Sequence, residues 1–360
     1  MLGTRPEIIK VAPLIQECAS RGIPLVVVHT GQHYDRILDA VFFSELRLDP
    51  PSYNLQTGEP ALPYPEKLGL MTTRVEEVLR KENVGIVLVQ GDTTSALAGA
   101  FAAKRLGLPV AHLEAGLRSR DYAMTEEWNR IMIDRLADVL LAPTDDCREQ
   151  LIAESADPAR IRVVGNSIVD AVLKHKELGA SVREALFARI GIEAGAYLLA
   201  TVHRAENTDD PERLRSIFDG IAGVAAELGL PAVMPLHPRT THLCEQYDLM
   251  VPGSIQVIEP LGYLEFLQLE ACARLVLTDS GGIQEEASIL KVPCVTMREN
   301  TERPETVKAG MNVIGGTDTH SIVRAAREIL KRDIAWSRLY GKGTTAPQTL
   351  DILTSLGYIG

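Results

Sequence analysis

LVLTDSGGIQEEASIL, at residues 275–290, passes from a short apolar run through a glycine pair into a helical pattern. The apolar run at 275–277 has the length and the unbroken hydrophobicity of a strand that is buried on both faces of a parallel sheet. Ser280, Gly281 and Gly282 then open a helix directly. A strand–turn–helix unit of this kind is typical of an α/β fold.

The same turn is a candidate phosphate site. The first N–H groups of a helix have no partner within it and carry the positive end of the helix dipole, so they attract an anion. Glu285 and Glu286 follow closely; helix capping explains one carboxylate there and leaves the other to bind hydroxyl groups. No GxxxxGK(S/T) or GxGxxG motif follows a strand, which argues against a nucleoside triphosphate or tightly bound NAD.

Apolar runs of strand length alternate with helical patterns along nearly the whole chain, which predicts the α/β class. The runs lie at 25–28, 86–89, 109–111, 139–142, 161–164, 198–202, 232–236, 255–258, 275–277 and 293–297, and the helical patterns include 67–82, 94–106, 210–228 and 319–331. We expect an N-terminal Rossmann-like domain at 1–166, completed by a C-terminal helix at 346–360, and a second Rossmann-like domain at 167–345.

Composition narrows the class of protein. The 360 residues are 46% hydrophobic and 24% charged, which excludes a disordered chain, and the net charge of −11 argues against nucleic-acid and anionic-membrane partners. The five cysteines form no CxxC pair, which argues against a zinc knuckle and favours a reducing cytoplasm. The turn at 3–6 has almost nothing before it, so we expect about five residues of a central strand to precede Met1.

Polar and glycine-bearing turns follow the predicted strands. They read GTRPE (3–7), TGQH (30–33), QGDTT (90–94), HLEAGLRS (112–119), VGN (164–166), TVHRAEN (201–207), PLHPRT (235–240), TDSGG (278–282) and RENTERPE (298–305). Parallel sheets bind ligands at the carboxyl ends of their strands, so two such edges would face each other across one cleft.

Acid/base groups occur among these turns. Asp92, Glu114 and Glu126 come from the first domain and His203 from the second, and such groups suit proton transfer when brought to one point. Two structural alternatives remain open. Asp92 could simply cap the helix that begins at Thr94, and a histidine at a strand end is often only a hydrogen-bonding group.

GTRPE, QGDTT, EAGLRS, TEEWNR, HRAEN, TDSGGIQEE and TERPE, in this order, resemble the non-hydrolysing UDP-N-acetylglucosamine 2-epimerases. The resemblance implies two Rossmann-like domains facing across a cleft, a glycosyltransferase-B-like architecture. It also implies an isomerase that interconverts UDP-GlcNAc and UDP-ManNAc for polysaccharide biosynthesis. By the same resemblance we expect a cytoplasmic homodimer that needs no cofactor or metal and takes a UDP-sugar as its substrate.

The resemblance implies roles for individual residues. Asp92, Glu114 and Glu126 match the acid/base carboxylates, and His203 matches the histidine that assists the departure of UDP. The matched substrate contacts are Arg5, Lys10, His237, Phe266, Ser280, Gly281, Gly282, Glu286 and Arg303. Within that set, the SGG turn is expected to bind phosphate, Glu286 the ribose, and Phe266 to lie near the uracil.

Some positions depart from the family pattern. The chain has Thr125 where members commonly have proline, Ala205 where they have arginine, and Gln32-His33-Tyr34-Asp35-Arg36 in place of QHxxM. The last segment helps bacterial members to bind UDP-GlcNAc as an activator, so we expect substrate activation to be weak or absent. Two enzyme alternatives stay open, a 2-epimerase of a modified sugar such as UDP-2,3-diacetamido-2,3-dideoxy-glucuronate and a glycosyltransferase of the same fold. A binding protein is disfavoured because the acid/base set would have no use.

Overall fold

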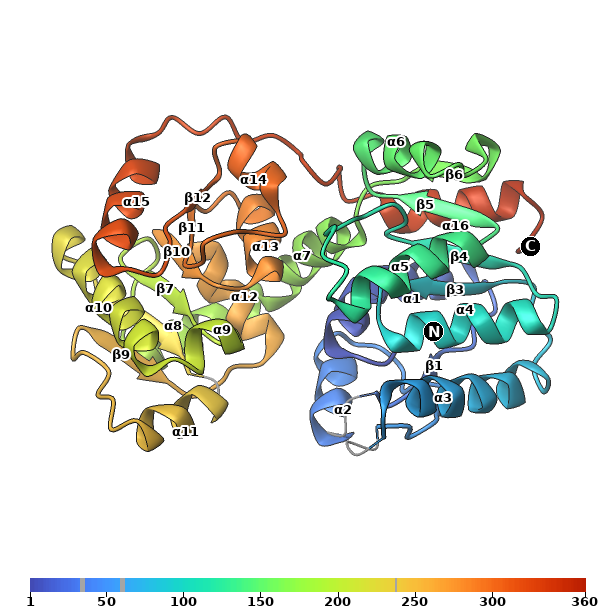
Figure 1. Cartoon of the computed structure of the whole chain (residues 1–360), viewed down its shortest axis with the longest axis horizontal. Coiled ribbons are helices and arrows are strands. Elements are labelled where there is room, and N and C mark those ends of the chain that lie inside the picture. The colour runs from blue at the N-terminus through green and yellow to red at the C-terminus, as the bar shows by residue number, and fades with distance from the viewer. Residues whose placement is uncertain (33–35, 59–61, 237) are drawn as a thin grey trace. The chain divides into compact units, whose positions relative to one another are not determined.

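The computed structural model describes residues 1–32, 36–58, 62–236 and 238–360 (Figure 1). The chain divides into two compact units. Unit 1 comprises Met1–Ala171 and Tyr340–Gly360, and unit 2 comprises Val172–Leu339. Strands and helices alternate in both units, and the strands of each sheet are parallel, so the predicted α/β class is confirmed.

Unit 1 contains two parallel sheets. Their strands are β1 (Val28–His29), β2 (Tyr53–Asn54), β3 (Val87–Gln90), β4 (Val110–Leu113), β5 (Val139–Ala142) and β6 (Ile161–Val163). The order is β3-β4-β5-β6 in the larger sheet, and β1 pairs with β2 in the smaller one. All four residues of β4 and of β5 are buried, as expected for central parallel strands that are covered on both faces.

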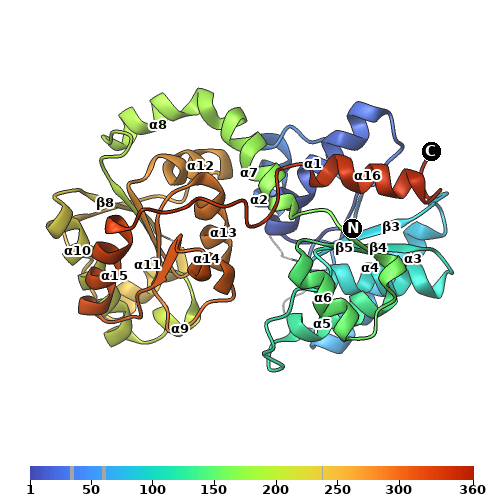
Figure 2. The same cartoon turned by 90° about the horizontal axis from the view of Figure 1, so that it is seen from above.

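Helices cover the faces of these sheets. They are α1 (Arg5–Arg21), α2 (Arg36–Glu45), α3 (Tyr64–Leu79), α4 (Thr94–Arg105), α5 (Thr125–Leu136), α6 (Asp145–Ala153) and the C-terminal α16 (Thr345–Ser355), with a short 3-10 turn at Pro158–Arg160. Helices α3 and α4 pack side by side, and α16 lies along α1 (Figure 2). The last helix of the chain therefore completes the first unit.

Unit 2 holds one sheet of six parallel strands. These are β7 (Leu198–Thr201), β8 (Ala232–Pro235), β9 (Ile255–Ile258), β10 (Leu275–Thr278), β11 (Cys294–Thr296) and β12 (Asn312–Ile314), in the order β12-β11-β10-β7-β8-β9. The chain builds outward from β7 to β9 and then returns to β10 on the other side of β7. The topological switch point, where ligands of such sheets bind, therefore lies between β7 and β10.

The helices of unit 2 follow its strands. Helix α7 (Ser167–Leu178) enters from unit 1 and is followed by a 3-10 turn (Gly179–Val182) and α8 (Arg183–Ile190). The others are α9 (Ala205–Thr208), α10 (Pro211–Leu228), α11 (Pro238–Gln246), α12 (Tyr263–Cys272), α13 (Gly281–Leu290), α14 (Pro304–Lys308) and α15 (Thr319–Lys331). Helices α10 and α15 pack together over a core that includes Phe218, Leu277 and Ile322.

The main departure from the expected elements is the run at 25–28. It forms regular strand only from Val28 to His29, and the preceding residues are partly exposed rather than enclosed. In the part of the chain that the structure describes, no helix is long and apolar enough to cross a bilayer.

One buried carboxylate holds the start of α16. Asp170 accepts hydrogen bonds from the backbone N–H groups of Thr345 (3.1 Å) and Ala346 (3.0 Å), and it is 7% exposed. Asp170→Ala should lower the free energy of unfolding by about 2 kcal/mol, because two helix N–H groups lose their acceptor. Urea unfolding of the full chain measures this, with the exposed Asp146→Ala as control; equal losses in both variants would contradict it.

Candidate active site

The first cluster of candidate residues lies where β3 and β4 end, in unit 1. Glu114 directly follows β4 and is 6% exposed. Its carboxylate accepts hydrogen bonds from Lys10 Nζ at 2.6 Å and from Gln90 Nε2 at 2.5 Å. Its φ is +76°, a left-handed conformation that is costly for a residue other than glycine. The structure thus places two of the sequence-predicted site residues, Glu114 and Lys10, in direct contact, with Glu114 in a strained turn.

Asp92 lies one strand away, after β3. Its carboxylate forms an ion pair with Arg130, and its carbonyl accepts a hydrogen bond from Asn129 Nδ2 at 2.8 Å. Thr93, and not Asp92, caps the helix that follows, because the Thr93 hydroxyl accepts a hydrogen bond from Ala96 N–H. The capping alternative is therefore excluded, and the Asp92 carboxylate is held at the sheet edge by a cation.

The two glutamates that begin α5 are in different environments. Glu126 is exposed, whereas Glu127 is fully buried and accepts hydrogen bonds from Ser119 N–H (2.9 Å) and Arg120 N–H (3.0 Å). Burial alone would raise the pKa of Glu127, but these hydrogen bonds and the charge of Arg130 outweigh it and lower the pKa. Sequence analysis missed Glu127, since nothing local distinguishes it from its neighbour.

A buried ion cluster anchors the turn that carries Glu114. Asp134 contacts His112 Nδ1 at 2.6 Å and Arg118 Nη2 at 2.7 Å, and it accepts a hydrogen bond from Gly116 N–H at 3.2 Å. Arg118 also pairs with Glu154 at 2.6 Å. Both ends of the turn are thereby fixed to α5, which keeps the strained Glu114 in place.

The GTRPE turn is fixed by a carboxylate of its own. Glu7 is 2% exposed and accepts hydrogen bonds from Gly3 N–H at 2.9 Å and from Thr93 Oγ1 at 2.7 Å. Burial raises the pKa of Glu7. Arg5 begins α1 two residues earlier, and its guanidinium lies 5.9 Å from the centre of the Phe42 ring. Glu7 thus ties the turn of Arg5 to the turn of Asp92.

The second cluster lies at the switch point of the unit 2 sheet. Asp279, fully buried after β10, contacts His203 Nδ1 at 3.1 Å. It also accepts hydrogen bonds from the N–H groups of His203 and Arg204 and from Asn207 Nδ2. Burial opposes ionisation of Asp279, but its hydrogen bonds and the charge of His203 outweigh this and lower its pKa. The sequence pointed to His203 and missed Asp279, although it stands directly before Ser280.

Ser280, Gly281 and Gly282 begin α13 beside this pair. Ser280 is the N-cap, and its side chain does not cap the helix. A Cβ added to Gly281 would lie 3.1 Å from Glu302 Oε2 and 3.9 Å from Arg204 Nη2. Arg298 pairs with Glu302 at 2.9 Å. The first turn of α13 is thus a glycine-lined helix N-terminus with arginines close to it, which suits a phosphate.

Glu285 and Glu286 have different partners. Glu285 pairs with Arg303 at 2.6 Å, and Glu286 accepts a hydrogen bond from the Tyr263 hydroxyl at 3.2 Å. Phe266 lies half-buried on α12, three residues after Tyr263 and therefore on the same side of that helix. Burial, and then the nearby charge of Glu286, raises the pKa of the buried Glu270 carboxyl. His237 lies outside the described residues.

Comparison with known proteins identifies the class. Residues 16–354 match the family model described as UDP-N-acetylglucosamine 2-epimerase. UDP-N-acetylglucosamine 2-epimerase of Methanocaldococcus jannaschii is 44% identical, over 98% of both chains. A crystal structure of that organism's UDP-GlcNAc 2-epimerase, in complex with UDP-GlcNAc and UDP, aligns with TM-score 0.86 at 43% identity over 98% of both chains.

A relative named for a different sugar nucleotide is also similar to the chain. UDP-2,3-diacetamido-2,3-dideoxy-D-glucuronate 2-epimerase of Pseudomonas aeruginosa is 39% identical, over 99% of both chains. All these relatives are epimerases, so the chain is an isomerase of the sugar-nucleotide class. It belongs to the UDP-N-acetylglucosamine 2-epimerase family, as its motifs predicted.

The buried cluster around Asp134 generates a stability prediction. Burial would raise the pKa of Asp134, but His112 and Arg118 outweigh it and hold the pKa below the usual 3.8. The ion cluster therefore stabilises the fold above about pH 4 and less so as pH falls through the lowered pKa. Asp134→Asn should lower the free energy of unfolding by about 3 kcal/mol at pH 7, because the buried Arg118 and His112 side chains lose their carboxylate partner.

Urea unfolding between pH 3 and 7 measures this effect. The gap between wild type and Asp134→Asn should narrow below pH 4, as the wild-type carboxylate becomes protonated. The matched control is Asp121→Asn, which changes an exposed aspartate whose carboxylate accepts a hydrogen bond from Ala123 N–H. A gap independent of pH would contradict the ion-pair interpretation.

Proposed function

We propose that this protein is a UDP-N-acetylglucosamine 2-epimerase that interconverts UDP-GlcNAc and UDP-ManNAc. The observation that carries the proposal is His203, fixed by the buried Asp279 beside the glycine N-terminus of α13. In the same chain, Glu114 and Asp92 are each held against a cation. The His203 cluster suits the departure of a diphosphate, and the Glu114 and Asp92 carboxylates suit proton transfer at carbon.

The chemistry follows from the sugar. No ring carbonyl stands next to C2, so its proton is not acidic and an enolate route is closed. In the proposed route a base removes the C2 proton, the C–H electron pair forms the C1=C2 bond, and the C1–O bond breaks with its electrons on UDP. The resulting 2-acetamidoglucal takes UDP back at C1 and a proton at the opposite face of C2.

Inversion at C2 explains why several carboxylates are needed. A proton leaves from one face and arrives at the other, so a single group in one position cannot serve both. Glu114 and Asp92 come from neighbouring strand ends, β4 and β3, and each is paired with its own cation. We assign proton transfer to these two and to Glu126, whose side chain is exposed at the start of α5.

Departure of UDP is assigned to unit 2. The N–H groups of Gly281 and Gly282 and the Ser280 hydroxyl are proposed to hold the diphosphate, because charge builds up there as the C1–O bond breaks. His203, with Nδ1 directed to Asp279, presents Nε2 for the leaving oxygen. Glu286 is proposed to bind the ribose hydroxyls, Phe266 to contact the uracil, and Arg5, Lys10, His237 and Arg303 to complete the contacts.

The proposal also includes the domain boundaries. We propose that the acid/base domain comprises 1–166 with 346–360 and that the UDP-binding domain comprises 167–345. The compact units divide five residues later at the first boundary and six residues earlier at the second, after Ala171 and before Tyr340. We also predict a cytoplasmic homodimer without a cofactor, with weak or absent substrate activation. Residues 33–35 of the activator segment lie outside the described residues.

Solvent exchange tests the function. Incubation with UDP-GlcNAc in deuterated water should give UDP-ManNAc and deuterium at C2 of both sugars by NMR, because the base equilibrates its proton with solvent. Glu114→Gln, Asp92→Asn and His203→Asn should each slow exchange by roughly 100-fold or more. Asp219→Asn, which changes an exposed residue of α10, is the control. No exchange in the absence of an acceptor would favour the glycosyltransferase alternative.

A 2-epimerase of a modified sugar is the second candidate, favoured by the 39% identity to the Pseudomonas aeruginosa enzyme. Its substrate carries a carboxylate at C6 that would call for an additional cation. The same NMR assay with UDP-2,3-diacetamido-2,3-dideoxy-glucuronate decides between the two. A larger kcat/KM for that sugar than for UDP-GlcNAc would overturn the proposed substrate while leaving the reaction type intact.

Asp279 is proposed as a positioning residue for His203. Asp279→Asn should reduce kcat by roughly 100-fold and leave KM within about twofold, because the imidazole loses its orienting acceptor while the UDP contacts remain. Steady-state kinetics with UDP-GlcNAc measure both constants. Asp318→Asn, an exposed helix cap in the same unit, is the control. A rise in KM at unchanged kcat would show that Asp279 only supports binding.

A further inference from the structure

Glu270 is a carboxyl group enclosed within unit 2, on α12, outside all of the motifs that resemble the epimerase family. Its side chain is fully buried, and among the described residues no N–H or O–H group donates a hydrogen bond to either of its oxygens. An ionised carboxylate there would lose its hydration without compensation. The surroundings therefore favour the neutral carboxylic acid, which can donate a hydrogen bond as well as accept one.

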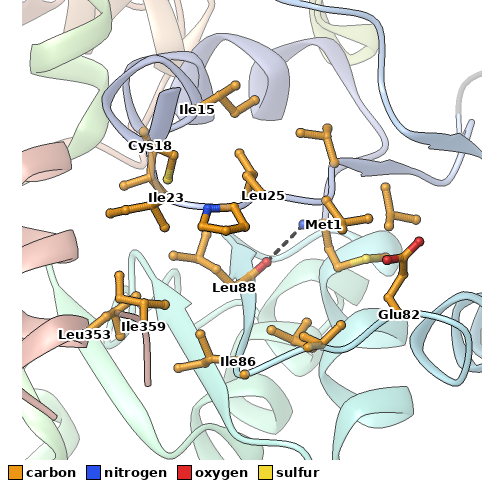
Figure 3. Close-up of a pocket in the computed structure, with 18 of the residues that line it drawn as sticks. Met1, Ile15, Cys18, Ile23, Leu25, Glu82, Ile86, Leu88, Leu353 and Ile359 are labelled. Carbon is orange, nitrogen blue, oxygen red and sulfur yellow. Dashed lines mark hydrogen bonds between the residues drawn. The ribbon is translucent and has the colours of Figure 1, made fainter. Parts of the chain in front are cut away.

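A glutamate of unit 1 shows the more usual arrangement beside hydrocarbon. Glu82 lines the apolar cavity that residues of α1, α3 and α16 enclose (Figure 3). It accepts a hydrogen bond from the Tyr53 hydroxyl at 2.7 Å, and part of its surface remains in solvent. Glu82 thus has both a donor and water, whereas Glu270 has neither among the residues that the structure describes.

Glu286 of α13 is the group that Glu270 faces. Burial, the charge of Glu286 and a side-chain hydrogen bond with Glu286, in that order, raise the pKa of Glu270 well above its usual range. Two carboxyl groups form a hydrogen bond only if one of them carries a proton. Glu270 is 0% exposed and Glu286 is 8% exposed, so the proton belongs on Glu270, whose charged form is the more costly of the two.

The position of Glu270 within α12 favours the same proton. Helix α12 ends at Cys272, so Glu270 lies in its last turn, where the negative end of the helix dipole disfavours a carboxylate. Tyr263 lies seven residues earlier, on the same face of the helix, and its hydroxyl donates to Glu286 Oε1 at 3.2 Å. One face of α12 therefore offers Glu286 two donors, a phenol and a carboxylic acid.

The titratable side chains around this pair do not supply a positive charge that would hold Glu270 ionised. Burial lowers the pKa of His175, whose ring lies 5.6 Å from the Tyr263 ring, to about 4, so this imidazole is neutral at pH 7. Burial is also the main cause of the raised pKa values of Tyr263, Tyr197 and Cys294. On α13 itself, the neighbouring Glu285 is paired with Arg303.

Glu286 needs a fixed orientation for its proposed role. It lies four residues after Gly282, and therefore on the same side of α13 as the glycine turn. The ribose hydroxyls that it is proposed to bind are two donors in a fixed geometry. A carboxylate that rotates freely would lose side-chain entropy on binding them, whereas one already held by two donors would lose less.

We propose that Glu270 is a positioning residue of the UDP site, which donates a hydrogen bond to Glu286 and, together with the Tyr263 hydroxyl, holds that carboxylate ready to accept the ribose hydroxyls. The inference rests on the proposed function, because it requires Glu286 to bind the ribose. Glu270 acts on the affinity for the nucleotide and leaves the chemical step unchanged. The competing interpretation is a structural role, in which the pair only stabilises the packing of α12 on α13.

Binding of two nucleotides to the full-length chain tests the proposal. Glu270→Leu keeps the volume and removes the donor, so it should weaken UDP binding by roughly 10-fold. Binding of 2′,3′-dideoxyuridine diphosphate, which lacks the ribose hydroxyls, should weaken by less than about twofold. Glu270→Gln retains an N–H donor and should stay within about threefold of wild type for both nucleotides. Calorimetric titration measures the affinities, with Glu328→Leu at an exposed position of α15 as the control.

The outcomes separate this inference from the proposed function. Equal UDP affinity in wild type and Glu270→Leu would overturn the inference. An equal loss for both nucleotides would overturn it as well, by showing that Glu270 only supports the fold. Failure of the wild-type protein to bind UDP, or to prefer it to the dideoxy nucleotide, would instead overturn the ribose assignment of Glu286 and the inference with it.

Infrared spectroscopy detects the proton without a variant that removes the donor. The difference spectrum between wild type and Glu270→Gln at pH 7 should contain the C=O stretch of a protonated carboxyl group. Addition of UDP should shift this band, because Glu286 becomes a weaker acceptor for Glu270 when it also accepts the ribose hydroxyls. A difference spectrum that contains only carboxylate bands would overturn the inference.

Discussion

Buried carboxylates that accept hydrogen bonds from backbone N–H groups hold the functional turns of this protein. Asp279 binds the N–H groups of His203 and Arg204, and Glu127 binds those of Ser119 and Arg120. Parallel strands leave such turns at the sheet edge without ladder partners, so their N–H groups need another acceptor. A carboxylate is strong enough to fix two of them at once. The geometry of the site depends on this interaction in both units.

The buried carboxylates fall into two groups according to the direction in which their pKa is shifted. Backbone N–H groups or cations lower the pKa of Glu127, Asp134 and Asp279 despite burial. Burial raises the pKa of Glu7 and Glu270, where fewer opposing charges are present. The fold therefore buries fixed negative charge at its turns, and the arginines there are paired with carboxylates, Arg130 with Asp92 and Glu127 and Arg204 with Glu302.

Local pattern was enough to predict the α/β class, the strand at 139–142 and the helix that starts at Gly281. It was not enough where contacts in the folded chain decide the outcome. No local pattern indicates that Glu127 is buried and accepts hydrogen bonds from the N–H groups of Ser119 and Arg120, or that Thr93 rather than Asp92 caps the following helix. The strand expected at 25–28 forms regular pairing with β2 only at Val28 and His29, a limit that hydrophobicity alone does not reveal.

The two ends of the unit 1 sheet therefore have different requirements. At the carboxyl end, Glu114 adopts a left-handed backbone that only a rigid surrounding tolerates, and the Asp134 cluster supplies that rigidity. At the amino end, Leu2 pairs with β1 and the Met1 amine donates to the Leu88 carbonyl of β3. Arg5 and Lys10 stand on the helix that follows those two residues. The Lys10–Glu114 pair joins α1 to the strained turn after β4, so the position of this helix fixes where the Lys10 charge lies beside the carboxylate.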